Sequence, residues 1–570
     1  MRLLRRLGRW AGAGLWFVVL APALAVVPAA VLDRGPDGAA RPTLFPAALV
    51  ALDPFVREGV RNSLVVAAAV AGVSLVLGVG LARGAVGRRF WGRPILAALG
   101  IAPLAIPPVV EALGLRLAFG PLAMWPGVGP ALRSGVPADL GAWIGWFWVG
   151  LASGVPLVAL ASGAALARAE PAWADAARLA GASRRTIWRQ LVWPVIRPSA
   201  ARAAGAVFTL TLVEPGAPLL LGLRRTLAFQ LVEAALGPDP APRAALLALT
   251  ALGLAVAGQV LLGWWGGPPV PRPSEAPTAR PEPARGPRAA VWGLVAGGWA
   301  LVAWLPTLAV FARAGGTPPG GGGRRPLAAL RGALADPIAA RLILNAAALG
   351  LAVVAIDLAL AWTVSAWAGR RRERVAALAA WPDRFPPLAL GVGALVLPGL
   401  LGLGADALRA AHAPGRVVHG LQVLAQDLDP VRPPGILLAL AVAAVRLPYL
   451  ARTIEAGRGL SRPVLTEAAI TLGGAPRAAR RMASGRLGGS RGAIVLTFAL
   501  AATDLAPALL LAPTAEGRPL APGLLILADE PGDGLSRASA LASLAAVVNL
   551  AALALAARRR IGTLGERFHG

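Results

Sequence analysis

Apolar residues along this chain fall into long blocks rather than into alternating or one-sided patterns. Each block is about twenty residues long, and short stretches rich in Arg and Pro separate the blocks. A run of this length is typical of an α-helix that crosses the hydrocarbon core of a bilayer. The pattern predicts twelve spans, at residues 10–32, 62–82, 94–119, 140–167, 200–222, 242–265, 290–312, 342–368, 378–403, 435–450, 491–512 and 536–557.

Composition agrees with an all-α membrane protein. Of the 570 residues, 56% are hydrophobic and 15% are charged, and the mean hydropathy is +0.65. A soluble protein carries about 25% charged residues. The net charge is +28, from 56 basic and 28 acidic residues; every basic residue is Arg, and the Arg residues lie at the ends of blocks instead of on one solvated face. We therefore expect the lipid bilayer as a partner and no nucleic acid.

Several kinds of chemistry are excluded by residue types that the chain lacks. It has no Cys and three His, which excludes disulfides, Cys-ligated zinc, iron–sulfur clusters and thiol nucleophiles. It has no Lys, so it cannot form the phosphate-binding loop whose Lys reaches nucleotide phosphates. We expect no catalytic residues, no metal site, no cofactor and no ATPase site in this chain.

The distribution of Arg predicts the orientation. Arg2, Arg5, Arg6 and Arg9 precede the first block, which is long enough to be kept as a span rather than cleaved as a signal peptide. If this end is cytoplasmic, the cytoplasmic side collects about two Arg for each one on the other side, as the positive-inside rule requires. Both termini are therefore expected in the cytoplasm.

Polar landmarks recur in the two parts of the chain. They form the pairs Asn62 and Asn345, Asp175 and Glu467, and Glu214 and Asp504. The members of each pair are 283, 292 and 290 residues apart, and such near-constant displacement predicts two parallel copies. We expect two homologous six-helix halves, 1–265 and 290–570. A Pro-rich, aromatic-free stretch at 266–289 is expected to be a cytoplasmic linker, and 315–325 an external loop.

The segment after the fourth span is helical in pattern but is not a polar tail. In PAWADAARLAGASRRTIWRQLVWPVIRP, residues 171–198, small side chains share one helix face where a partner backbone can approach. Gly181 is expected to form a turn and Ser183 to cap a second helix that ends between Pro194 and Pro198. Residues 461–491 repeat the order of an acid, two Ala and a Gly six positions after the acid.

These two segments resemble the permease signature of ATP-binding-cassette importers. The first copy matches as DAARLAGAS and LVWP, and the second matches as EAAITLGGA but has Arg486 and Leu487 in place of the Pro step. In that family the segment forms coupling helices that sit in grooves on two ATPase subunits. The resemblance assigns this role to Asp175, Ala176, Ala177, Gly181, Glu467, Ala468, Ala469 and Gly473.

The resemblance extends over most of the chain. Twelve spans in two fused halves, the Pro-rich third span APLAIPPVVEALG, and the fifth-span strings LVEPGAPLLLG and ATDLAPALLLAP are similar to the fused permeases for ferric iron, with thiamine permeases next. This implies a type I importer permease in the plasma (inner) membrane of a bacterium. It also implies an external substrate-binding protein and two ATPase subunits as partners.

Ionisable residues inside apolar spans are expensive and are therefore candidates for the translocation pathway. They are Glu111, Glu214, Asp357 and Asp504. Arg116 and Arg446 also fall within apolar spans, and two roles are open for them: a place on the pathway, or a position near a span end from which the side chain reaches the interface. For Asp175 and Glu467 the alternative role is to stabilise a helix N-terminus. His412 and His419 have no third ligand near them in the sequence, and we interpret them as solvated loop residues.

Two other functions share part of this pattern. Major-facilitator transporters also have twelve spans in two parallel halves, and ARGAVGRRF at 82–90 half resembles their loop motif, but its Asp is missing and facilitators lack the repeated segment after the fourth span. A membrane-embedded enzyme needs a nucleophile, base or metal ligands that converge, and none do here.

Overall fold

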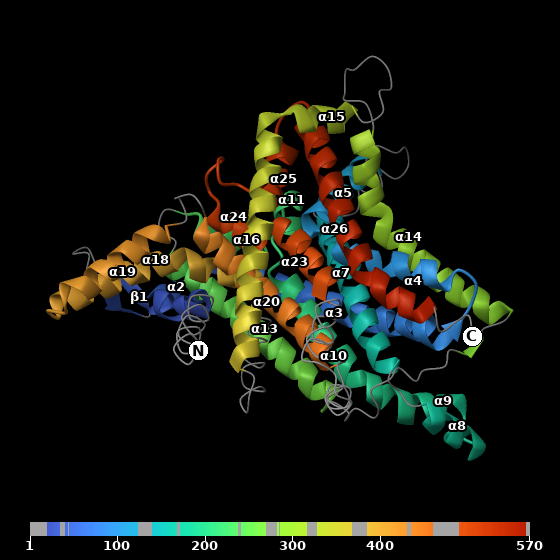
Figure 1. The fold of residues 1–570 in the computed structure, drawn as a ribbon. Helices are drawn as coiled ribbons and strands as arrows, with labels where there is room; N and C mark the ends of the chain where they lie inside the picture. The colour runs from blue at the N-terminus through green and yellow to red at the C-terminus, as the bar shows by residue number, and fades with distance from the viewer. Residues whose placement is uncertain are drawn as a thin grey trace, which may run out of the picture.

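The computed structural model describes residues 20–34, 40–43, 45–122, 140–167, 171–237, 241–268, 282–283, 286–315, 328–367, 385–429, 435–459 and 490–565. Almost all of these residues are helical, and the described strands are two or three residues long. The protein is an all-α, multi-pass membrane protein, as the sequence predicts. Figure 1 shows its long helices gathered in one bundle.

The elements that precede the Pro-rich stretch include most of the predicted spans of the first part. They are the helix Leu20–Val31, β1 Leu32–Arg34, β2 Ala40–Pro42, α2 Phe45–Leu52, α3 Pro54–Gly87, β3 Arg88–Arg89, α4 Arg93–Ile101, the 3-10 helix Ala102–Ala105, α5 Pro108–Leu122, α7 Leu140–Leu166, α8 Pro171–Leu179, α9 Arg184–Ile187, the π-helix Trp188–Val192, α10 Trp193–Leu212, α11 Gly216–Leu221, α12 Leu227–Ala235 and α13 Ala241–Gly266.

The later elements follow a similar order. They are β4 Glu282–Pro283, α14 Pro287–Gly315, α15 Ala328–Ala335, α16 Pro337–Trp367, α18 Pro387–Ala410, α19 Gly415–Asp427, α20 Ile436–Gly459, α23 Ser490–Ala502, α24 Ala506–Leu511, α25 Leu520–Asp529 and α26 Gly534–Gly565. β1 pairs with β2 in antiparallel orientation, and β3 pairs with β4 in parallel.

Seven of the described helices are long and apolar enough to cross a bilayer, namely α3, α7, α13, α14, α16, α18 and α26. α4 and α5 form an eighth span if they are taken together, although they are bent by 102° where Pro residues interrupt the backbone hydrogen bonds. Parts of the expected first, tenth and eleventh spans are shorter apolar helices, and the fifth is α10 with α11. The count of twelve stays a prediction.

Small residues let the helices approach closely. α3 and α7 pack against each other, and a Cβ at Gly78 would lie 2.7 Å from the Cβ of Val158, while one at Gly150 would lie 2.9 Å from Val70. Inside a bilayer the hydrophobic effect does not drive helices together, because the lipid tails are as apolar as the helix surfaces. Close van der Waals packing of this kind therefore holds the helices together.

Two glycine contacts join the early and late parts of the chain in a reciprocal way. Gly114 of α5 lies against the backbone carbonyl of Pro306 in α14, and Gly393 of α18 lies against the backbone carbonyl of Pro22 in the first apolar helix. A Cβ at either glycine would overlap that carbonyl. The first span of each part therefore packs against the third span of the other.

Polar contacts at the start of the second span also occur twice. Asp53 accepts a hydrogen bond from the backbone N–H of Phe55 and pairs with Arg243, while Asp336 accepts one from Ile338 and pairs with Arg537. One turn or more further on, Asn62 donates to the carbonyl of Arg225, and Asn345 donates to the carbonyls of Glu516 and Arg518, each in the loop before a short helix, α12 or α25.

The helix after Ser183 differs from the expectation that it would end between Pro194 and Pro198. It continues as the π-helix Trp188–Val192 and then as α10 to Leu212. Pro194 lacks an N–H and its ring would clash with the preceding turn of an ordinary α-helix. The wider π-helical turn, in which the N–H of Trp193 donates to Trp188, accommodates Pro194, so the helix continues.

Candidate functional site

The fifth span is broken at an acidic residue in each part of the chain. α10 ends at Leu212 and α11 begins at Gly216, so that Glu214 lies between them; α23 ends at Ala502 and α24 begins at Ala506, so that Asp504 lies in the second break. Pro follows each acid within three residues and cannot donate the hydrogen bond that would continue the helix. The sequence placed both acids within a span but did not predict the breaks.

Glu214 binds the backbone of its own break. Its two carboxylate oxygens accept hydrogen bonds from the N–H groups of Gly216 at 2.6 Å and Ala217 at 3.0 Å. These N–H groups open α11 and have no partner within the helix. The carboxylate therefore holds the broken backbone in a defined shape.

The two breaks lie against each other. A Cβ at Gly216 would be 3.1 Å from the side chain of Leu505 and 3.4 Å from the Cα of Val109 in α5. Gly216 belongs to the first break and Leu505 to the second, so the equivalent interruptions of the early and late parts meet, with α5 beside them. Glycine at 216 allows this approach.

Glu111 of α5 is fully buried in the same region. Neither of its carboxylate oxygens has a hydrogen-bond partner among the described residues, and the side chain interacts electrostatically with Glu214. A carboxyl group in this apolar setting is stable when it is protonated, or when a nearby cation offsets its negative charge.

The second break carries a cation as well as acids. Arg446 of α20 donates hydrogen bonds to Asp504 at 2.5 Å and to the carbonyl of Leu500 at 3.3 Å. Asp357 of α16 is fully buried, its oxygens lack a hydrogen-bond partner among the described residues, and it interacts electrostatically with Arg446. Of the two roles open to Arg446, this contact with a buried acid favours a place beside the predicted pathway acids. The side chain of Arg446 is 26% exposed.

The predicted pathway acids thus gather in two groups. Glu111 and Glu214 surround the first break, and Asp357 and Asp504 surround the second with Arg446. Of these four acids, Asp504 pairs with Arg446, Glu214 binds the backbone of its break, and Glu111 and Asp357 lack a hydrogen-bond partner among the described residues. Arg116 does not belong to it: this residue pairs with Asp529 at 2.6 Å, and both side chains are more than a third exposed.

The segment after the fourth span forms a helical hairpin, α8 with α9, which we call the α8–α9 hairpin. α8 ends in a Schellman motif, in which the N–H of Ala182 donates to Ala177 and that of Gly181 donates to Arg178. Gly181 has a φ of +82°, and Ser183 caps α9 by accepting from the N–H of Thr186 at 3.1 Å. The predicted turn and cap are both confirmed.

The α8–α9 hairpin stands outside the helical bundle (Figure 1). Two of its large apolar side chains are exposed: Leu179 is 91% exposed and Trp173 is 44% exposed. Asp175 and Ala176 are also exposed, whereas Ala177 is half-buried. The exposed acid pairs with Arg178 of its own helix at 2.8 Å, a contact of little energy at the surface. These two exposed apolar side chains make the hairpin a candidate docking surface.

Of the remaining candidate residues, some lie outside the described part of the chain and the two His residues lie on the surface. Glu467, Ala468, Ala469 and Gly473 lie outside the described residues, as do residues 269–281 of the linker. His412 and His419 are exposed, although His419 lies on α19 rather than in a loop. Within the described part of the chain, no three His, Cys, Asp or Glu residues are grouped so that they could hold a metal ion.

No protein-family model matches the chain, and no curated protein matches it.

Proposed function

We propose that this chain is the membrane-spanning permease of an ATP-driven importer. The observation that carries the proposal is the α8–α9 hairpin, a capped element with the DAARLAG sequence that presents exposed apolar residues outside the bundle. A segment with this sequence resembles the coupling helix of such permeases. Here it would sit in a groove on an ATPase subunit, and residues 467–473 would serve a second ATPase subunit in the same way.

The proposed architecture is two homologous six-helix halves, 1–265 and 290–570. The support comes from contacts that occur twice: the Asp53–Arg243 and Asp336–Arg537 pairs, and the Gly114–Pro306 and Gly393–Pro22 contacts. Independent spans would not reproduce both the sequence order and the polar partners. In this arrangement the first span of each half packs against the third span of the other half.

Transport would follow from movement of the halves. ATP binding closes the two ATPase subunits, which draws the coupling segments together, and the halves rock as rigid bodies. The two broken fifth spans meet where the halves join, so opening there would expose Glu111, Glu214 and Asp504 to one side of the membrane at a time. The ATPases supply the energy, and this chain supplies the path.

The first experiment measures ATP hydrolysis. The purified chain in lipid nanodiscs should not hydrolyse ATP, and vanadate-sensitive turnover should appear when the matching ATPase is added.

The variant Leu179→Ser should lower ATPase retention by about tenfold, as expected for an exposed apolar anchor. Leu236→Ser is the control, because Leu236 is 52% exposed but lies at the end of α12. Equal retention by the two variants would contradict docking at the hairpin.

The second proposal concerns the substrate, ferric iron, with thiamine as the alternative. Support comes from the fifth-span strings and from the four acids near the breaks, since carboxylate oxygens suit hard cations. An external binding protein would deliver the ion. Deletion of the gene should impair growth under iron limitation, whereas lost thiamine uptake with normal iron uptake would favour the alternative.

Location and orientation are proposed as the inner membrane of a bacterium with both termini cytoplasmic. Reporter fusions after Ser183, at Ser274 and at Gly570 should all report the cytoplasm, and one at Gly320 should report the opposite side. An external signal after Ser183 would exclude ATPase docking at the hairpin.

A further inference from the structure

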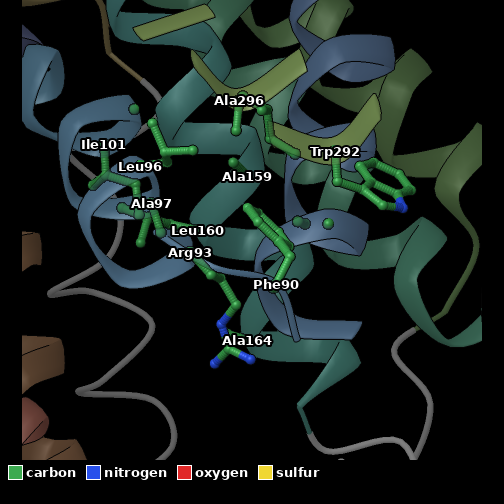
Figure 2. A pocket seen from close by; sticks show the side chains of 15 residues that line it. Phe90, Arg93, Leu96, Ala97, Ile101, Ala159, Leu160, Ala164, Trp292 and Ala296 are labelled. Carbon is green, nitrogen blue, oxygen red and sulfur yellow. The ribbon is translucent and has the colours of Figure 1, made fainter. Parts of the chain in front are cut away.

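A cavity of about 420 Å³ opens between α3, α4, α7 and α14, away from the acids of the broken spans. This volume falls within the range of about 300–1000 Å³ that is usual for small-molecule sites. Figure 2 shows side chains from these helices converging on it. Nothing in the proposed transport function uses this space.

The walls of the cavity are almost entirely apolar. Leu81, Leu96, Ile101 and Leu160 contribute aliphatic surface, and Trp292 closes one side with its indole packed over Gly84. Leu160 is 42% exposed, so the cavity is open at the surface of the bundle. In a membrane the surroundings of such an opening are acyl chains.

One end of the cavity is basic. Arg93 is the one charged residue among those that line it, and in Figure 2 its guanidinium points away from the apolar walls at the lower end. Arg93 donates to the backbone carbonyl of Arg88 at 3.2 Å. Arg83 lies in the chain between the lining residues Ala82 and Gly84, with its guanidinium carbon 4.2 Å from the ring centre of Trp188. The acid nearby in the chain trace is Glu282, whose strand pairs with Arg88.

The same end carries the marks of a membrane interface. Trp91 is 98% exposed, and Trp is the residue typical of the headgroup region. The contact between Arg83 and Trp188 places this end beside the base of the α8–α9 hairpin. The cavity therefore runs from an Arg-rich, Trp-bearing end into the apolar interior, which matches the order of headgroup and tail in a phospholipid.

We propose that this cavity is a binding site for one anionic phospholipid. An acyl chain lies between α4, α7 and α14, and the phosphate lies against Arg93 with Arg83 and Arg88 nearby. Apolar burial holds the tail, and charge complementarity selects an anionic headgroup over a zwitterionic one. A cationic ligand is disfavoured because the lining contains no acid.

The test compares phosphatidylglycerol with phosphatidylcholine of the same acyl chains. The purified full-length chain is delipidated in detergent, each lipid is added back, and native mass spectrometry counts the lipid that remains bound. We expect one phosphatidylglycerol per chain and clearly weaker binding of phosphatidylcholine.

Two variants with matched controls locate the site. Ala296→Phe fills the cavity and should abolish the tightly bound lipid, while Val295→Phe, on the adjacent and 45% exposed position of α14, should retain it. Arg93→Gln should weaken phosphatidylglycerol about fivefold, the loss expected for one Arg near an anionic surface. Arg57→Gln, exposed at the opposite end of α3, should leave the affinity unchanged.

Three results would overturn the proposal: no retained lipid in the unaltered chain, equal retention of the two lipids, or equal retention by Ala296→Phe and Val295→Phe. Thermal unfolding of each variant without lipid separates lost binding from lost folding. The inference is independent of the transport proposal, because it concerns lipid retention and needs no ATPase.

Discussion

Arg446 and Asp504 form an ion pair of 2.5 Å inside the membrane-spanning region. The pair joins α20 to the break between α23 and α24. Arg446 also interacts electrostatically with the buried Asp357 and donates a hydrogen bond to the carbonyl of Leu500. The three partners of Arg446 are thus two acids and a backbone carbonyl. One cation therefore stabilises groups from three segments of the chain.

This arrangement predicts unequal effects of removing either member of the pair. Arg446→Leu leaves Asp357 and Asp504 without a cation and should cost about 3–5 kcal/mol of stability, as for a broken buried ion pair. Asp504→Leu should cost less, because Arg446 keeps Asp357 and Leu500. Thermal unfolding in detergent measures both.

A further variant checks the explanation. Adding Asp357→Asn to Arg446→Leu removes one uncompensated charge and should recover part of the lost stability. Equal losses in the two single variants, or no recovery, would show that Arg446 does not balance both acids.

The reciprocal glycine contacts predict which small residues tolerate a methyl group. Gly114→Ala places a Cβ into the backbone carbonyl of Pro306, and because backbone cannot rotate away, the cost should exceed the about 1–3 kcal/mol of ordinary overpacking. Gly399→Ala on α18 meets nothing within 4 Å and should be neutral or stabilising, since Ala favours helix by up to about 1 kcal/mol. Membrane abundance and unfolding temperature decide between them, and similar values for the two would contradict the close packing of α5 on α14.

The sequence predicted the parts of this fold that depend on local composition. Long apolar blocks require helices in a bilayer, and the Gly181 turn and Ser183 cap follow from backbone preferences within a few residues. The acids were recognisable as candidates because a charge in an apolar span is costly.

The rest depends on contacts between distant residues. The break at Glu214 is held by its carboxylate and by a second break nearly 300 residues later in the chain, and no local pattern reveals that partner. The sequence left the role of Arg446 open between a span end and the pathway, because its distance to Asp504 exists only in the folded bundle. The helix through Pro194 continues because a π-helical turn precedes it, which a rule for ordinary helices misses.

The Gly181 turn gives a test of docking with a control of the same strain. Gly181 and Gly222 are both exposed, have φ of +82° and +74°, and meet nothing within 4 Å where a Cβ would be added. Val at either position should strain the backbone by about 1–3 kcal/mol. Only Gly181→Val should reduce ATPase binding and transport, because Gly222 lies at the end of α11.

The second proposed coupling segment, residues 461–491, extends this prediction. It lacks the Pro step and carries several Arg and Gly residues after Gly473, which offers less apolar surface to a partner. We therefore expect Gly473→Val to weaken ATPase retention less than Gly181→Val does, with both proteins inserted at normal levels. Retention is measured by pull-down normalised to membrane abundance. A greater loss from Gly473→Val would reverse the asymmetry, and equal loss from Gly222→Val would show that strain alone is responsible.

The proposed duplication predicts that a pair of contacting residues in the early part of the chain can be replaced by the equivalent pair of the late part. In the early part of the chain Gly59 of α3 faces Gln230 of α12, and a Cβ on Gly59 would lie 2.5 Å from the Gln230 amide nitrogen. In the late part the large and small residues are reversed: Leu342 of α16 faces Gly523 of α25, where a Cβ would lie 2.5 Å from the leucine side chain. Each pair places one side chain in the space left by one glycine.

If the two pairs are equivalent, the early position should accept the large and small residues in the reversed order that the late position has. Gly59→Leu alone should clash with Gln230 and cost about 1–3 kcal/mol, whereas Gly59→Leu combined with Gln230→Gly should recover most of that loss because it copies the late arrangement. Gln230→Gly alone is the required third variant, since it removes the hydrogen bond of 2.7 Å to the Phe55 carbonyl and leaves a cavity. Unfolding temperatures of the three variants give the coupling energy between the positions. A double variant that loses the sum of the single losses would contradict the equivalence of the two pairs, whereas a smaller loss supports two halves built on one plan.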